Sequence, residues 1–340
     1  MKFLSLEMRM CVVCTAAFVL QLCLTGYAVA ESPETPKAKL TSPAEIVTIM
    51  ENSALSYELR APGPSSSEGD DSKGVLSPGL ILKRKGDKTT LDRYALSPPA
   101  DSRLAVGEKV FRDGNFEGAI KIYEEVRRLE PDYHQALILI GDAYFSMRQF
   151  DEAQRYFEEA IRLNFIDYQA HWFLADTLWS LGRREHAMVE ITIAHLLNLN
   201  HKTVRKSLVG YRQRLGRPWK DWTYAPRVGL SREGNRVLIH CSEEWIGYCL
   251  VKAVWRYEPG YAESKGPAGE VEYNSLEERE ALAAVLAHND TLGHIRSIVE
   301  DGSVEEFLWY EVVAKRSPAA LLLLPRDTFM SIVTYVDRYH

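Results

Sequence analysis

The residues best suited to chemistry lie around position 241. Cys241 follows His240 in the stretch HCSEEW, and further titratable residues lie downstream, namely His288, Asp290, His294 and Asp301. A cysteine nucleophile needs a histidine within hydrogen-bonding distance and a third group that orients this histidine. Adjacent residues on a strand point to opposite faces, so His240 is a poor base for Cys241. We therefore expect no catalytic residues here.

The two cysteines outside the first thirty residues, Cys241 and Cys249, are also unsuited to metal binding. Cys241 and Cys249 are eight residues apart and no paired histidines accompany them, which makes a poor zinc site. In an oxidising compartment the two could form a disulfide, and otherwise they would be two buried thiols. The sequence also lacks a glycine-rich phosphate loop, a Gly-x-Ser-x-Gly motif and a His-Glu-x-x-His motif. We expect neither a metal nor a cofactor.

The first thirty residues, 1–30, have the features of a secretory signal peptide. Lys2 and Arg9 give a positive start, and an apolar run extends from Met10 to about Leu24. The Ala-Val-Ala that ends the segment has the small residues of a cleavage site. A membrane-spanning helix needs about 20 apolar residues, so this run is short for an anchor. We expect cleavage and a periplasmic or secreted protein, whereas an uncleaved segment would anchor the chain to a membrane.

The composition is that of a globular protein. Apolar residues make up 46% and charged residues 26% of the 340 residues, and this length suffices for about two domains. The formal net charge of −6 argues against nucleic acid as the main partner, because nucleic acid selects basic surfaces.

Residues 31–99 are expected to form a flexible arm. They are rich in proline, serine, glycine and charge, and the stretch RAPGPSSSEGDDSKG has the composition of a linker. One helix is expected within 42–57, because Ser42 is suited to the N-cap, Pro43 to the first turn and Glu45 to a capping box. This helix is too short to be stable alone in water, so we expect it to dock on something.

An internal repeat is the strongest signal in the chain. Between residues 100 and 201, the same residue classes return after 34 positions. Two sets of equivalent positions hold small residues, and one set holds large apolar residues. The small sets are Gly107, Gly141 and Ala175, and Ala119, Ala153 and Ala187; the large set is Tyr123, Phe157 and Ile191. Small residues let two helices approach closely, and the large side chains fill the space opposite them.

This pattern resembles the tetratricopeptide repeat family, whose period is 34 residues. The resemblance covers about 100–201 and implies a solenoid of three repeats, each made of two antiparallel helices. Gly114 and Gly182 are expected to end the first helix of their repeats, whereas Arg148 stands where the second repeat should have glycine. The helical stretch at 202–216 follows directly, and we assign it as the helix that caps the solenoid.

Residues 217–340 resemble no family that we recognise. The stretch RVGLSREGNRVLIHC alternates around an Arg-Glu-Gly-Asn turn and predicts a β-hairpin. Helical periodicity follows Ser242, and capping boxes begin at Ser275 and Ser303. We expect a mainly α protein in which a small, mostly helical α+β domain follows the solenoid. The expected domains are the signal peptide (1–30), the arm (31–99), the solenoid with its cap (100–216) and this α+β domain (217–340).

In tetratricopeptide repeat proteins, the concave surface formed by the first helices binds peptides, and the resemblance assigns three columns of residues to it. They are Leu104, Ile138 and Trp172; Glu108, Asp142 and Asp176; and Phe111, Phe145 and Trp179. The groove is aromatic with an acidic seam, which favours positive or N–H-rich ligands. The carboxylates have the wrong sign for the family's clamp on C-terminal carboxylates. Alternatively, these side chains pack one repeat against the next, or the groove holds the chain's own segment 42–57.

The expected function is that of a non-catalytic exported scaffold or adaptor that binds a protein or peptide segment in this groove. Such a protein is similar to the secreted repeat proteins that many bacteria make for envelope assembly. Two alternatives remain open. Residues 217–340 could form an enzyme domain that the repeats supply with substrate. Basic residues within 202–227 and acidic residues within 268–311 could also stack copies of the chain, through charges that salt would screen.

Overall fold

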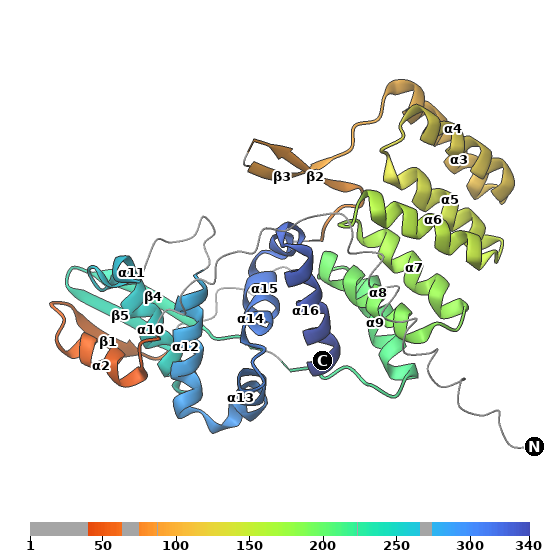
Figure 1. Ribbon diagram of the computed structural model, residues 1–340. Coiled ribbons are helices and arrows are strands. Elements are labelled where there is room, and N and C mark those ends of the chain that lie inside the picture. Colours follow the sequence, from red (N-terminus) through yellow and green to blue (C-terminus); the bar gives the residue numbers. More distant parts are fainter. Residues whose placement is uncertain (1–39, 63–74, 87, 223, 266–273) are drawn as a thin grey trace, which may run out of the picture. The chain divides into compact units, whose positions relative to one another are not determined.

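The computed structural model describes residues 40–62, 75–86, 88–222, 224–265 and 274–340 (Figure 1). The expected signal peptide lies outside these ranges. Most of the described residues are helical, and a small part forms β-sheet, as expected for a mainly α protein. Within the described ranges, no helix has both the length and the apolar character needed to cross a membrane.

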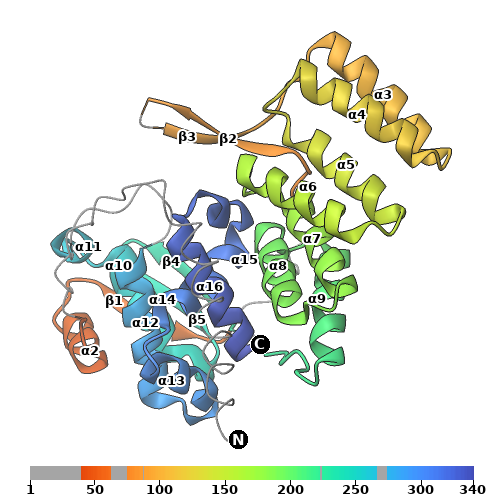
Figure 2. The same cartoon turned by 45° about the vertical axis from the view of Figure 1, so that its right-hand side comes forward.

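Helical hairpins form the middle of the chain, and they stack side by side in both views (Figure 1 and Figure 2). Their helices are α3 (Pro98–Arg112), α4 (Phe116–Leu129), α5 (His134–Ser146), α6 (Phe150–Leu163), α7 (Tyr168–Ser180), α8 (Arg184–Leu197) and α9 (Lys202–Arg214). The bounds of α5, α7 and α9 recur at intervals of 34 residues, and so do those of α4, α6 and α8. The repeat seen in the sequence is therefore a repeat of helical hairpins.

Glycine allows the two helices of a hairpin to approach closely. A β-carbon added to Gly107 would lie 2.5 Å from the ring of Tyr123, and one added to Gly141 would lie 2.6 Å from the ring of Phe157. Both rings are fully buried. The recurring pair of a glycine and a large ring is thus the contact between α3 and α4 and between α5 and α6.

The turns within the hairpins adopt the left-handed backbone conformation. Gly114, Gly182 and Gly216 have φ angles of 80°, 78° and 72°. Arg148 occupies the same position after α5 with a φ of 61°, and it is the only non-glycine residue with positive φ among those described. The turn after α5 therefore has the same conformation as the others, although it contains arginine instead of glycine. Arg148 is strained, because its β-carbon crowds the backbone.

Arg148→Gly is expected to stabilise the protein by about 1 kcal/mol. Relief of left-handed strain, roughly 1–2 kcal/mol, exceeds the roughly 0.5–1 kcal/mol of extra chain entropy that glycine loses on folding. Urea unfolding measures the difference. Gly182→Ala is the matched control, because it places a β-carbon in the same turn conformation and should lower stability. A lower unfolding midpoint for Arg148→Gly would contradict the strain.

Residues 76–97 lie along the loops that join one hairpin to the next. The side chain of Asn198 forms two hydrogen bonds to the backbone of Leu76. It accepts from the Leu76 amide at 3.0 Å and donates to the Leu76 carbonyl at 2.9 Å. Asn164 donates to the carbonyl of Leu80 at 2.7 Å, and Glu130 accepts from the amide of Ser97 at 3.1 Å. These three side chains are 34 residues apart and each caps the C-terminus of a helix. The repeat therefore places an equivalent hydrogen-bonding side chain at each of these loops, and each binds the backbone of the segment 76–97.

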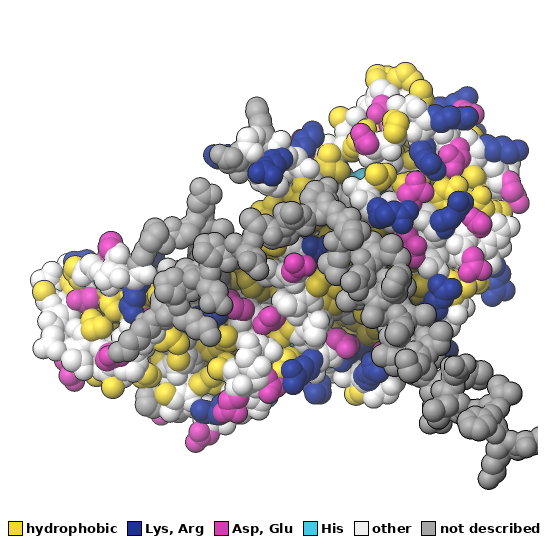
Figure 3. Space-filling model, in the orientation of Figure 1, with side chains coloured by type: hydrophobic (Ala, Val, Ile, Leu, Met, Phe, Trp, Pro, Cys, Tyr) yellow, Lys and Arg dark blue, Asp and Glu magenta, His cyan; other side chains and the backbone are white. Residues whose placement is uncertain are grey.

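A hairpin of strands β2 (Leu80–Lys85) and β3 (Lys88–Arg93) lies within this segment. Its side chains are largely exposed, and lysine and arginine gather on it (Figure 3). Lys83 pairs with Asp92 at 2.7 Å. The sequence assigned these residues to a flexible arm, which the structure corrects: an ordered hairpin is anchored at both ends by the inter-hairpin loops.

The first part of the arm belongs to the C-terminal domain. Strand β1 (Ser56–Arg60) pairs in parallel with β5 (Arg236–Cys241), which pairs antiparallel with β4 (Val228–Glu233). The sheet order is therefore β1-β5-β4. The predicted hairpin is β4–β5, and the arm adds a third strand to it.

Helix α2 (Pro43–Glu51) precedes β1 and is the docking helix expected within 42–57. Its Ser42–Glu45 capping box is present, and Ile46 is buried. The helix lies against α10 (Ile246–Tyr257) and α12 (Ser275–His288). The alternative that segment 42–57 fills the solenoid groove is wrong, because the C-terminal domain holds it.

Further elements complete the C-terminal domain. They are η1 (Glu243–Trp245), α11 (Tyr261–Ser264), η2 (Asp290–Leu292), α13 (Gly293–Glu300), α14 (Val304–Phe307), the π-helix η3 (Leu308–Val313), α15 (Ala314–Arg316), η4 (Pro318–Leu323) and α16 (Arg326–Tyr339). Helix α12 is capped by Asn274 and not by Ser275 as the sequence suggested. Both α16 and η4 contact α8, whose C-terminal half, residues 191–197, is entirely buried.

Candidate functional site

The cysteines of the C-terminal domain are bonded to each other. Cys241 and Cys249 form a disulfide with their Cα atoms 6.4 Å apart, so neither thiol is free as a nucleophile. His240 lies 3.2 Å from the carbonyl oxygen of Ala61. The ring of His294 packs against Trp222 at 4.9 Å. Among the described residues, therefore, no free thiol accompanies these two histidines.

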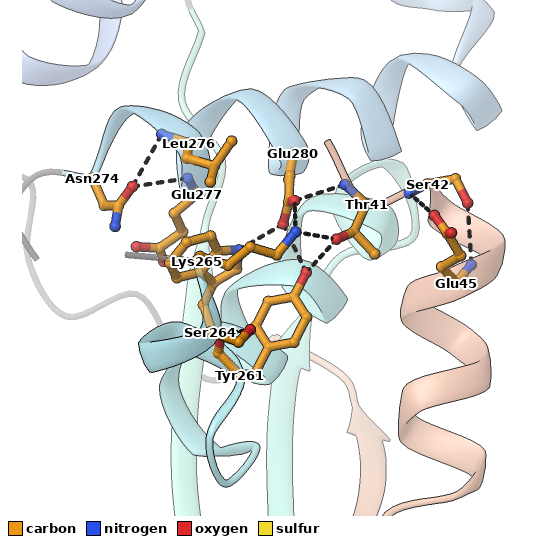
Figure 4. A network of polar contacts seen from close by, with 11 residues as sticks. Thr41, Ser42, Glu45, Tyr261, Ser264, Lys265, Asn274, Leu276, Glu277 and Glu280 are labelled. Atoms are coloured by element: carbon orange, nitrogen blue, oxygen red, sulfur yellow. Dashed lines mark hydrogen bonds and ion pairs between the residues drawn. The ribbon is translucent and has the colours of Figure 1, made fainter. Parts of the chain in front are cut away.

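A buried carboxylate joins the arm to the C-terminal domain (Figure 4). Glu280 accepts hydrogen bonds from Lys265 Nζ at 2.8 Å, Trp255 Nε1 at 2.8 Å, Tyr261 Oη at 2.9 Å and the Thr41 amide at 2.7 Å. Burial by itself raises the pKa of Glu280, but these hydrogen bonds outweigh it and lower the pKa. Because all the donors belong to the protein, this carboxylate is structural.

Glu278 has a similar environment. It accepts from Tyr248 Oη at 2.6 Å and Lys252 Nζ at 2.9 Å, and Arg316 lies 3.2 Å away. Burial raises the pKa of the Tyr248 hydroxyl, and the charge of Glu278 adds to this effect. No group of three or more His, Cys, Asp and Glu side chains suited to a metal occurs among the described residues.

A cleft of about 770 Å³ lies where α2 meets α10 and α12. Ile46, Val47, Leu250 and Val285 make its walls largely apolar, and Glu243 belongs to its lining. The volume suits a small molecule, and an apolar lining with a few polar side chains, here Ser242, Glu243, Glu244 and Asn289, is usual for a ligand-binding cleft.

The charged stretches proposed for self-assembly form ion pairs within the chain. Arg212, which is buried, donates to Asp337 at 2.9 Å, and Arg217 pairs with Glu185 at 3.0 Å. On the acidic side, Asp301 pairs with Arg338 at 3.2 Å. These internal pairs reduce the charge that either stretch presents to another copy.

The acidic column of the solenoid divides into two kinds of site. Asp176 accepts a hydrogen bond from the hydroxyl of Tyr211, which lies on α9. Asp142, at the equivalent position of α5, has no hydrogen bond or ion pair among the described residues, and burial raises its pKa. Glu108, on α3, is exposed and its carboxylate is likewise unpaired in the described part of the chain. Two of the three predicted carboxylates are thus open to a ligand.

The aromatic column packs against the start of the following helix. The ring of Phe111 contacts Phe116 at 5.1 Å, and that of Phe145 contacts Phe150 at 5.4 Å. In the third hairpin, the guanidinium of Arg184 lies 4.8 Å from the ring centre of Trp179. Phe111, Phe145 and Trp179 are nevertheless only partly buried, so each keeps an exposed part. The aromatic side chains combine packing within the hairpin with an accessible surface.

In the first column, Ile138 is buried, whereas Leu104 and Trp172 are partly buried. Ile138 is 3% exposed, which leaves little of its side chain for a ligand. Leu104 packs on the small cluster that contains Tyr133, and Trp172 lies 5.6 Å from the ring of His201. Apolar residues at this position fill the space between neighbouring helices.

The sequence interpretation missed Tyr211 and the loop residues that hold the arm. Both signals were present in the repeat. A shift of 34 residues aligns Tyr211 with Thr177 and Ala143, and the same shift relates Glu130, Asn164 and Asn198. A polar residue that recurs at a helix C-terminus is readily explained as a helix cap. Only the structure shows which other groups it hydrogen-bonds.

Comparison with known proteins identifies the repeat. Residues 110–164 match the family model described as Tetratricopeptide repeat. Similar solved structures include the first TPR domain of human RPAP3, with 22% identity and a TM-score of 0.33 over 34% of this chain and 92% of that chain. They also include the type III secretion chaperone SycD of Yersinia enterocolitica in complex with a peptide of the translocator YopD, with 16% identity and a TM-score of 0.33 over 35% of this chain and 96% of that chain. The TPR2B domain of yeast Sti1 in complex with pHsp70 is similar as well, with 16% identity and a TM-score of 0.33 over 35% of this chain and 99% of that chain.

No match was found among the curated proteins to which the chain was compared. The family match confirms tetratricopeptide repeats in the chain and does not extend to residues 217–340.

Proposed function

Because this chain contains tetratricopeptide repeats, we propose that it is a non-catalytic, exported scaffold or adaptor that binds a segment of another protein. The solenoid comprises three repeats, α3–α4, α5–α6 and α7–α8, and α9 caps it. The partner binds the concave surface formed by α3 and α5. The third repeat contributes less, because α9 covers its polar and aromatic groups.

The unpaired carboxylate of Asp142 is the observation that carries this proposal. Desolvating a carboxylate without a partner costs free energy, and most partly buried carboxylates in proteins are hydrogen-bonded. Asp142 lies one helical turn from the partly exposed ring of Phe145. A carboxylate without a partner among the described residues, next to a partly exposed aromatic ring, suits a binding site for another molecule.

Export is supported by the disulfide and by the N-terminal sequence. Disulfides persist in oxidising compartments and are rare where thiols are kept reduced, and Cys241 and Cys249 are bonded. The basic start, apolar run and small-residue site within 1–30 match a secretory signal. We propose a periplasmic or secreted location on these grounds.

Photo-crosslinking tests the adaptor function in the full-length protein within its native cells. A photoreactive amino acid at position 145 should crosslink to a separate protein, which mass spectrometry identifies. The same amino acid in place of Arg128, an exposed residue of α4, is the control and should not capture that protein. If position 145 crosslinks only within the chain, or no better than position 128, the groove does not bind a partner and the proposal fails.

A further inference from the structure

The chain itself shows which side chains suit the polar and aromatic groups of its groove. On α9, the ring of Tyr211 stacks on Trp179, with centroids 4.1 Å apart and an interplanar angle of 16°. The hydroxyl of the same residue donates to the Asp176 carboxylate. The guanidinium of Arg214 lies 5.8 Å from the centre of the Trp179 ring. One helical turn of α9 thus provides a ring, a hydrogen-bond donor and a cation to the third repeat.

The equivalent residues of the other repeats are too short to do this. The positions of Tyr211 and Arg214 correspond to Thr177 and Ser180 on α7, and to Ala143 and Ser146 on α5. Thr177 donates its hydroxyl to the carbonyl of Phe173 within its own helix, and alanine has no donor. Within the described residues, neither an aromatic ring from the next repeat nor a cation contacts Phe111 or Phe145 at the position where Tyr211 contacts Trp179.

We propose that the first two repeats bind a flexible segment of a partner protein through its tyrosine and arginine side chains, with Glu108–Phe111 and Asp142–Phe145 as the two subsites. This inference rests on the proposed function and specifies its ligand. The partner's side chains make the contacts that Tyr211 and Arg214 make within the chain. They approach from the concave side, because α5 and α7 occupy the space corresponding to α9.

The physical reasons for this ligand follow from the groups in the subsites. A tyrosine ring stacks on phenylalanine, and its hydroxyl forms a charge-assisted hydrogen bond to a carboxylate. An arginine pairs with the second carboxylate and lies over the second ring. An acidic segment is repelled by Glu108 and Asp142. A phenylalanine in place of tyrosine leaves the carboxylate without a donor, which weakens binding.

The test uses a labelled octapeptide, blocked at both ends, that carries one tyrosine and one arginine three residues apart. Its affinity for the full-length mature protein is measured by fluorescence anisotropy at low salt. Two related peptides, with tyrosine replaced by phenylalanine or arginine replaced by glutamate, should bind about tenfold more weakly. Equal affinity for all three peptides, or no binding of the first, overturns the inference.

Asp142→Asn and Asp176→Asn form a matched pair of variants. Asp142→Asn should weaken binding of the tyrosine–arginine peptide about tenfold without lowering the melting temperature, because no described residue pairs with this carboxylate. Asp176→Asn should leave the affinity unchanged and lower the melting temperature, because Tyr211 then donates to a neutral amide oxygen, which accepts a weaker hydrogen bond than the carboxylate does. If Asp176→Asn weakens binding as much as Asp142→Asn does, the assignment of the subsites is wrong.

Failure of this inference can be distinguished from failure of the proposed function. A partner crosslinked from position 145 whose captured segment lacks tyrosine and arginine would refute the ligand and leave the adaptor function standing. The absence of any crosslinked partner would refute both.

Discussion

Replacing Gly247 with alanine will destabilise the C-terminal domain by about 3 kcal/mol, because a new β-carbon cannot be accommodated. It would lie 2.5 Å from the carbonyl oxygen of Ala284 and 2.7 Å from its carbonyl carbon. These atoms belong to the backbone of α12 and cannot move aside as a side chain would. Helix α10 must therefore shift away from α12, which opens the contact on which α2 also packs.

Urea unfolding of Gly247→Ala, followed by circular dichroism, measures this loss. Gly210→Ala is the matched control, since Gly210 also lies inside a helix but a β-carbon there meets no atom within 4 Å. Alanine has the higher helix propensity, so this control should gain about 1 kcal/mol. The close approach of α10 and α12 would be refuted if both variants were stabilised.

Replacing Glu280 with glutamine is expected to cost about 3 kcal/mol at neutral pH. The carboxylate accepts hydrogen bonds from Lys265, Trp255, Tyr261 and the Thr41 amide, and it is fully buried. Glutamine has one acceptor oxygen, and its NH2 group must face groups that are themselves donors. Because glutamine is neutral, Lys265 also loses its counter-charge. The arm should then detach near Thr41, and amide hydrogen exchange in α2 and β1 should rise with it.

The same carboxylate predicts how stability depends on pH. The pKa of Glu280 is lower in the folded protein than its ordinary value of 4.5. Its stabilising contribution is therefore complete above pH 4.5 and is lost as the pH falls through the folded pKa. The difference in unfolding free energy between wild type and Glu280→Gln should shrink in this acidic range. A difference that stays constant down to pH 3 would show that the charge contributes nothing.

Glu233→Gln is the control, because it removes a carboxylate that is exposed and not buried. Glu233 pairs with Arg236 at 3.0 Å on the exposed turn of the β4–β5 hairpin. Solvent screens such a pair, so this substitution should change the stability by less than about 0.5 kcal/mol at any pH.

The solenoid was predictable from the sequence because its contacts are local. Gly107 and Tyr123 meet across one turn, and the same pair recurs as Gly141 and Phe157. Such short-range contacts impose a period on the sequence, and the period reveals the hairpin. Arg148 shows the limit of this inference, since it stands where the repeat should have glycine while the backbone retains the left-handed conformation.

For the proposed binding surface, the sequence shows which residues share equivalent positions but not which of them are accessible. The columns of Glu108, Asp142 and Asp176 were placed correctly on α3, α5 and α7. Whether a side chain is open to a ligand depends on the neighbouring helix, which a column of equivalent positions cannot show. Asp142 is unpaired while Asp176 is bonded to Tyr211, although the two residues have the same place in their repeats.

The helical hairpins, their period and the capped helix at the start of the arm can be read from the order of the residues. Each of these features depends on residues that are close in the chain. The course of the arm, in contrast, becomes apparent only in the folded protein. Strand β1 pairs with β5 across about 180 residues, and Leu76 is held by Asn198. Such partners share no periodicity or spacing, because backbone hydrogen bonds accept almost any sequence and long-range packing selects among them.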